Sequence, residues 1–147
     1  VLHAVRLIGW NPWATRRMPL LWILHAGYAW IPVGFLMLAF GALGWVPIVL
    51  AIHAFAAGGV GGLIIGMITR TALGHTGRAL VAGRAEVAMY ALVQLAALVR
   101  VFGPLLAPAA YQGWVNASAM LWSAAFGLYF IVYWPRLTRA RADGKPV

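Results

Sequence analysis

The sequence predicts an all-α membrane protein, a polytopic bundle of four transmembrane helices. Of its 147 residues, 64% are hydrophobic and only 9% are charged, against about 45–50% and 25% in an ordinary soluble domain. Four stretches are apolar over the length that a helix needs to cross a bilayer, which is about 20 residues. This composition excludes a soluble globule. The lack of cysteine excludes a disulfide scaffold and thiolate metal sites.

The four expected spans cover residues 20–43, 46–68, 85–106 and 111–134. Pro47 stands in the first turn of the second span, where its missing N–H costs nothing. Pro104, Pro108 and Pro135 fall at span ends, so Pro32 alone interrupts a span. We therefore expect one membrane domain over residues 1–147, with residues 69–84 forming a loop between the second and third spans.

The positive charges predict the orientation of the bundle. Eleven Lys and Arg residues stand against two acids, a net charge of +9, which in a soluble protein would suggest nucleic-acid binding. Here the charges flank the spans on one side only, while the other two connections carry none, and no nucleic-acid partner is expected. By the positive-inside rule, both chain ends and the loop 69–84 face the cytoplasm. The flanking residues are Arg6, Arg16, Arg17, Arg70, Arg78, Arg84, Arg136, Arg139, Arg141 and Lys145.

Two of the spans combine a row of glycines with a histidine on the opposite face. In the second span the glycines recur at four-residue spacing, which lets a neighbouring helix approach closely. They are Gly58, Gly62 and Gly66, with His53 opposite. The first span repeats this arrangement, with Gly27, Gly34 and Gly41 on one face and His25, Tyr28 and Pro32 on the other. Each of these helices should have a packing edge and a histidine edge.

The third and fourth spans each carry a polar face. In the third span this face comprises Glu86, Tyr90, Gln94 and Arg100; in the fourth it comprises Asn116, Met120, Ser123 and Gly127. Polar groups in hydrocarbon cost several kcal/mol unless they are hydrogen-bonded. We therefore expect both faces to be directed away from lipid, meeting each other, a cofactor or another part of the protein.

Arg100 is the most unusual charge because it lies deep in the third span, toward the outer side of the membrane. The two acids, Glu86 and Asp143, stand at the other end of that span and in the tail. Four arrangements would satisfy the guanidinium: helix-end carbonyls, snorkelling to the interface, an acid on a further segment, or an anionic ligand such as a haem propionate.

Three histidines are candidate metal ligands or proton-handling groups. His25, His53 and His75 have no HxxH or HxxxH spacing, so any metal site must be assembled across helices. Two ligands of one haem usually need similar depths in the membrane. His25 and His53 lie at different depths, so His25 and His75 are the easier pair to place on one haem. The alternative for each is an interhelical hydrogen bond.

The connection after the second span has an unusual composition. Residues 69–80 read TRTALGHTGRAL, and Gly74 and Gly77 allow backbone turns whose N–H groups converge on an anion, with Arg70 and Arg78 nearby. The alternative to an anion site is a basic loop whose arginines only determine the orientation of the spans in the membrane.

Two stretches resemble a known family. The runs GGVGGLIIGMITRTALGHTGRAL (residues 58–80) and PLLWILHAGYAWIPVG (residues 19–34) strongly resemble the NnrS family of bacterial membrane proteins. The resemblance implies a multi-pass protein of the bacterial inner membrane that contains haem and copper and is linked to nitric oxide and nitrosative stress. Family members are much longer, and the likeness is to their C-terminal part. We therefore expect this chain to be a piece of a longer polypeptide or a subunit of a larger assembly.

The leading hypothesis is a haem-binding and copper-binding membrane protein of the nitric oxide response. Under it, His25, His53 or His75 ligates the metal, and Tyr28, Arg70, Arg78 and Arg100 contact the cofactor. The first alternative is a non-catalytic subunit that packs against further transmembrane helices. The second is an ion or proton carrier that uses the polar face of the third span. Soluble-enzyme chemistry is not indicated, since the sequence has no nucleophile elbow, carboxylate pair or nucleotide-binding loop.

Overall fold

The computed structural model describes residues 1–144, so Lys145 lies outside the described residues. Within that range the chain is helical and forms no strand, which confirms the all-α prediction. Four helices are long and apolar enough to cross a membrane: Pro19–Ala42, Val49–His75, Arg84–Leu106 and Pro108–Thr138. The elements in order are α1 (Leu2–Gly9), α2 (Pro12–Thr15), α3 (Pro19–Ala42), α4 (Val49–His53), η1 (Ala54–Val60), α5 (Gly61–His75), α6 (Arg84–Leu106), η2 (Pro108–Ala110) and α7 (Tyr111–Thr138).

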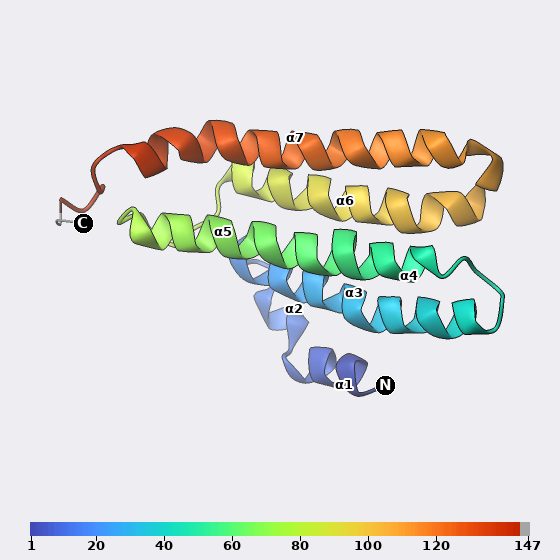
Figure 1. Cartoon of the computed structure of the whole chain (residues 1–147). Coiled ribbons are helices and arrows are strands. Elements are labelled where there is room, and N and C mark those ends of the chain that lie inside the picture. Colours follow the sequence, from blue (N-terminus) through green and yellow to red (C-terminus); the bar gives the residue numbers. More distant parts are fainter. Residues whose placement is uncertain (145–147) are drawn as a thin grey trace.

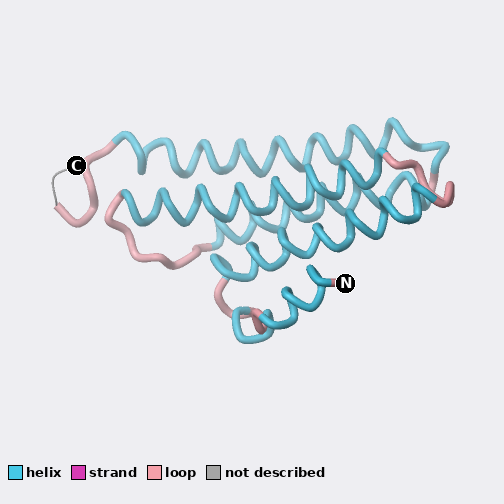
Figure 2. The backbone as a smooth tube through the Cα atoms, turned by 60° about the horizontal axis from the view of Figure 1, so that its bottom comes forward, coloured by secondary structure: helices cyan, strands magenta, loops and turns pink. Residues whose placement is uncertain are grey.

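The long helices lie side by side as an antiparallel bundle (Figure 1). In Figure 2 the α3–α4 and α6–α7 connections lie together at one end, while the α5–α6 connection and the C-terminal tail lie at the other. Helices α1 and α2 fold back beneath α3 rather than extending the bundle. The arginines of the α5–α6 connection and of the tail therefore share one end, as the positive-inside reading requires.

The glycine rows make the contact between α3 and the second span. A Cβ on Gly62 would lie 3.0 Å from the Cα of Gly27, so the two backbones approach each other directly at this point. Gly58 leaves room for the ring of Trp30, and a Cβ on Gly66 would lie 2.9 Å from the Ile23 side chain. The predicted packing edges of both helices are confirmed. Gly61 lies outside this row and leaves room for the Trp122 ring of α7.

The second span is not a uniform α-helix. Its middle turns, Ala54–Val60, form a π-helix between α4 and α5, an uncommon conformation that is found often at functional sites. The sequence there is AFAAGGV, and the small residues Ala54, Gly58 and Gly59 are buried. His53 is the last residue before this segment.

The helix also continues past the predicted span end at residue 68, through His75. The hydroxyls of Thr69, Thr71 and Thr76 bond to carbonyls one turn earlier and so fit the helix. Gly77, with φ +69°, ends it. The backbone N–H groups of Thr76, Gly77 and Arg78 donate to the carbonyls of residues 72, 74 and 73. The prediction that N–H groups near Gly77 converge on an anion is therefore wrong, because they form a helix C-cap.

Helix α6 lies in the middle of the bundle and contacts each of the other spans. Its polar face points inward as expected: Glu86 is 2% exposed and Tyr90 is fully buried. Around them lies the larger hydrophobic core, which includes Ile23, Ile65, Met89, Val93 and Tyr133. A smaller core toward the other end contains Trp30, Ala54, Ala97 and Val101.

Helix α7 has its polar face on the outside. The residues that it buries are Ser118, Ala125 and Tyr133, whereas the predicted inward face, Asn116, Met120, Ser123 and Gly127, is exposed. Of the three partners expected for these faces, the first is wrong: the two polar faces do not meet each other, because α7 contacts α6 through Ser118 and Tyr133 instead. The Ser118 hydroxyl, for example, donates to the Ala96 carbonyl across 2.9 Å.

Candidate functional site

His53 and Arg100 form a contact between the second and third spans. The Nη2 atom of Arg100 lies 2.9 Å from Nε2 of His53. A guanidinium only donates hydrogen bonds, so Nε2 is the acceptor and the proton of the neutral imidazole is on Nδ1. The interhelical hydrogen bond, which was the alternative to metal ligation for His53, is therefore present in the structure.

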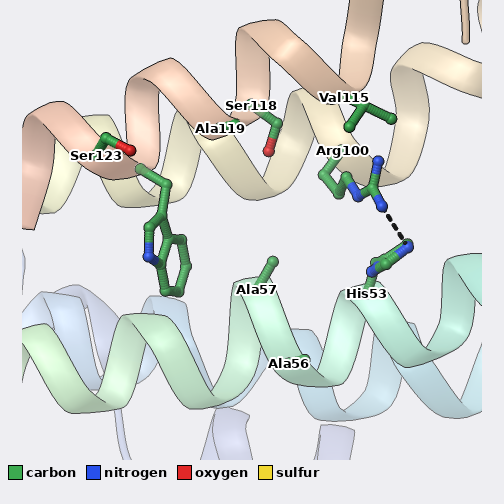
Figure 3. A pocket seen from close by; sticks show the side chains of 9 residues that line it. His53, Ala56, Ala57, Arg100, Val115, Ser118, Ala119 and Ser123 are labelled. Carbon is green, nitrogen blue, oxygen red and sulfur yellow. Dashed lines mark hydrogen bonds between the residues drawn. The ribbon is translucent and has the colours of Figure 1, made fainter. Parts of the chain in front are cut away.

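The two side chains lie at one end of a pocket of about 440 Å³ between the second span and α7 (Figure 3). The opposite end is formed by Trp122, and the walls between are mainly alanine and valine: Ala56, Ala57, Val115 and Ala119. The Trp122 ring of α7 reaches the second span, where Gly61 leaves room for it, and Figure 3 shows Ser118 and Ser123 on the same helix. The pocket is thus polar at one end and apolar along most of its length.

Among the described residues, Arg100 has no carboxylate partner. Glu86 accepts hydrogen bonds from Arg136 (2.7 Å) and Tyr133 (2.9 Å), and Asp143 pairs with Arg141 at 2.7 Å. Arg100 instead bonds to a neutral imidazole and lies 5.8 Å from the centre of the Tyr111 ring. Its Nη1 atom is buried and has no hydrogen-bond partner within the described residues.

His25 lies in a different environment on the outer face of α3. Its Nδ1 is 3.0 Å from the carbonyl oxygen of Leu21, one helical turn earlier, so this nitrogen carries the proton and donates. The Thr15 hydroxyl, which itself donates to Pro12, is a second acceptor 3.4 Å away. The lone pair of His25 is therefore on Nε2. This imidazole lines a pocket of about 440 Å³ together with Pro12, Trp13, Arg16 and Trp22.

The short N-terminal helices complete this side of α3. His3 of α1 has its Nδ1 2.8 Å from the Tyr28 hydroxyl, and the Trp10 ring contacts both Tyr28 and His25. The spacing of His25 and Tyr28 predicts that they share one face of α3, but nothing in the sequence indicates that α1 covers this face. An eight-residue helix followed by a turn is too short to show in the hydropathy pattern which helix it packs against.

His75 and the arginines of the α5 end form a third group. His75 is exposed and lines a pocket of about 310 Å³ with Arg70 and Arg141. Arg141 donates to the His75 carbonyl at 3.1 Å, and its bonds to Asp143 raise the pKa of the guanidinium above its ordinary value. Arg78 lies beside this group, with Nη1 3.4 Å from the carbonyl of Thr76.

The three candidate histidines thus line three separate pockets. His53 faces α6 and α7, His25 faces α1 and α2, and His75 lies at the end of α5. Among residues 1–144, no three His, Asp or Glu side chains lie close enough together to hold a metal ion.

The comparison with protein families gives one match. Residues 1–141 match the NnrS protein family, which is nearly the whole chain. Neither a curated protein nor a solved structure matched the sequence. The match includes both stretches on which the resemblance was based and all four membrane-spanning helices. The chain belongs to the NnrS family.

Proposed function

We propose that this protein is a haem-binding membrane protein of the nitric oxide response, with His25 as the haem ligand. Membership of the NnrS family is consistent with a nitric oxide response protein in a membrane. The haem assignment rests on one observation: His25 has its Nδ1 proton committed to a backbone carbonyl, and its imidazole lines a pocket.

This arrangement suits metal ligation. A ligating histidine usually donates its other ring N–H to a carbonyl or carboxylate, which fixes the tautomer and the ring orientation. The bond from His25 to Leu21 has this form. Haem iron, unlike a bare transition metal ion, already has its macrocycle nitrogens as ligands and needs only one or two axial groups from the protein. The lack of a three-residue cluster within residues 1–144 is therefore compatible with haem.

The pocket around His25 also fits the rest of such a cofactor. Its volume of about 440 Å³ is within the range of small-molecule sites. Trp13 and Trp22 provide flat apolar surfaces for the macrocycle, and Arg16 provides a guanidinium for a propionate. We assign to Arg16 the role that sequence analysis suggested for Arg70, Arg78 and Arg100. A haem held here by His25 would supply an iron centre that binds a diatomic gas.

The other two histidines are less suitable. His53 would have to give up its bond from Arg100 before its Nε2 could bind a metal. His75 is exposed at the helix end and lies beside two arginines, Arg70 and Arg141, whose positive charges oppose a metal cation. We propose the bacterial inner membrane as the location, with the arginine-rich end of the bundle in the cytoplasm, because positive charge is retained on that side.

The test is the visible spectrum of the detergent-solubilised chain, oxidised and dithionite-reduced, with iron and copper counted per chain. We expect a haem absorption band and about one iron, since the pocket offers a single ligand. His25→Ala should lose the band, while His53→Ala and His75→Ala should keep it. An unchanged spectrum in His25→Ala would contradict the assignment, and a folded wild-type chain without iron would contradict haem binding.

A second candidate function is a subunit that packs against further transmembrane helices. The observation that favours it is the exposed face of α7, where Asn116 and Gly127 lie on the outside of the bundle. Polar and small residues are typical of contacts between membrane helices rather than of lipid-facing surfaces. The two functions are compatible, because this face is on α7 and the His25 pocket is on the far side of α3.

A further inference from the structure

The pocket between the second span and α7 contains a positive charge that the described chain does not neutralise. Arg100 is charged at any physiological pH, its one side-chain hydrogen bond is to a neutral imidazole, and both acids of the sequence are paired elsewhere. Its buried Nη1 has no acceptor. A charged donor left unsatisfied in an apolar environment is unfavourable, so this end of the pocket favours an anionic acceptor.

The rest of the pocket limits what that anion can be. Ala56, Ala57, Val115, Ala119 and the Trp122 ring give walls that are mostly apolar. A small anion such as formate would occupy only the arginine end of a 440 Å³ pocket and leave the rest without contacts. The shape and polarity favour a ligand with one acidic head and an apolar body.

The position of Arg100 in the membrane also fits an amphiphile. Arg100 is six residues before the end of α6 at Leu106, which at 1.5 Å per residue is about 9 Å along the axis. It lies beside Tyr111, the first residue of α7. From there, Val115 to Trp122 extends about 10 Å along α7 toward the bilayer centre. A head at Arg100 would be near the interface, with the tail running inward.

We propose that this pocket binds a single-chain amphiphilic carboxylate from the bilayer, with its carboxylate on Arg100 and its hydrocarbon chain along α7 as far as Trp122. His53 positions the guanidinium by accepting from Nη2 and is not itself a metal ligand. A carboxylate is preferred to a neutral head because it provides both the missing acceptor and the missing charge. The proposal does not depend on the haem assignment, which concerns the other face of α3.

The test uses fluorescence quenching by brominated dodecanoate, with the full chain in phosphatidylcholine nanodiscs at pH 8. Bromine quenches tryptophan on contact, and replacement of Trp122 by phenylalanine identifies the part of the signal that comes from this ring. We expect saturable quenching of Trp122. Arg100→Gln should raise the half-saturating concentration about tenfold or more, since a charge-assisted hydrogen bond of about 1.4 kcal/mol or more is lost.

Three controls make the result specific. Arg139→Gln removes an exposed charge at the other end of the bundle and should leave the binding curve unchanged. Brominated dodecanol has the same chain without the acid and should quench Trp122 only weakly, without saturation. Ala119→Leu fills the pocket wall while keeping Arg100, so loss of binding in this variant shows that the tail occupies the pocket even if Arg100→Gln folds poorly.

Three outcomes would overturn the proposal. Equal curves for wild type and Arg100→Gln would show that the guanidinium does not hold the head. Equal binding of the alcohol and the acid would show that the pocket takes any hydrocarbon chain. No saturable quenching in a folded wild-type chain would indicate that Arg100 is neutralised by another group, such as an acidic side chain on a further transmembrane helix.

Discussion

Four polar side chains on α6 each have a partner on a different helical segment. Glu86 bonds to α7, Tyr90 to Thr69 of α5 at 2.6 Å, Gln94 to Trp30 of α3 at 2.8 Å, and Arg100 to His53 of α4. Polar contacts inside a membrane bundle are directional, so they define which helices are neighbours and at what height. With their hydrogen bonds divided among four partners, these residues do not support the carrier hypothesis, which required them to act as one path.

Glu86 should be the residue of this face that contributes most to stability. It is buried and accepts bonds from Tyr133, Arg136 and the N–H of Gly83, the N-cap residue of α6. Glu86→Ala would leave a buried hydroxyl and a half-buried guanidinium unsatisfied. We expect a loss of about 2 kcal/mol or more in the free energy of unfolding, measured by denaturant titration in mixed micelles.

The control for this substitution is Arg139→Ala. Arg139 is exposed on the turn after α7, and exposed charges contribute about 0–1 kcal/mol. If Glu86→Ala were no more destabilising than Arg139→Ala, the network at the start of α6 would be unimportant for stability.

At the scale of the element, the second span shows how small residues allow an irregular helix. The π-helical segment is followed by Gly61 and Gly62, which lie between α3, α6 and α7. A wider helical turn loses internal contacts, and here the ring of Trp30 packs against it where Gly58 has no side chain. The segment places His53 on the side of α6, away from the glycine row that faces α3.

Gly62→Leu should disrupt the packing of three helices. Even a Cβ at this position would be 2.6 Å from Nε2 of Gln94 and 3.0 Å from the Gly27 backbone. We expect the midpoint temperature of unfolding in detergent to fall, with a loss of about 1–3 kcal/mol or more from overpacking. Gly113→Leu is the matched control, because a Cβ there meets nothing within 4 Å. Similar melting of the two variants would contradict the close packing.

At the scale of the whole molecule, burial is uneven among the four spans. In the most apolar 18-residue stretch of the second span, about half of the residues are buried inside the bundle, compared with 11% in the corresponding stretch of the fourth span. Helix α7 packs against the bundle through one side, and its other side carries the exposed residues Asn116, Met120 and Gly127. A helix at the edge of a bundle with polar residues on its free face is a natural place for another transmembrane helix to pack.

Cross-linking can test this face because the chain has no cysteine of its own. We expect Gly127→Cys, with open space around its Cβ, to give disulfide or bismaleimide-linked products in native membranes. Ile52→Cys, on the exposed apolar side of α4, should give few. Equal cross-linking at both positions would indicate random collision rather than a specific contact on α7.

The sequence by itself determined the class of fold, the number of spans and the glycine rows. These follow from local composition and helical periodicity, which do not depend on which helices are neighbours. It also identified the unusual residues, including Arg100, His25 and His53. Their roles in a cofactor site remain proposals.

Only the tertiary structure decided which side chains meet. The pairing of His53 with Arg100 joins residues 47 positions apart, and the cover of His25 by Trp10 depends on a turn after α1. The outward direction of the polar face of α7 was also decided by packing, since α7 contacts α6 through Ser118 and Tyr133, which bond to Ala96 and Glu86. Contacts between distant segments depend on the relative rotation and height of whole helices, and a pattern within one helix does not contain that information.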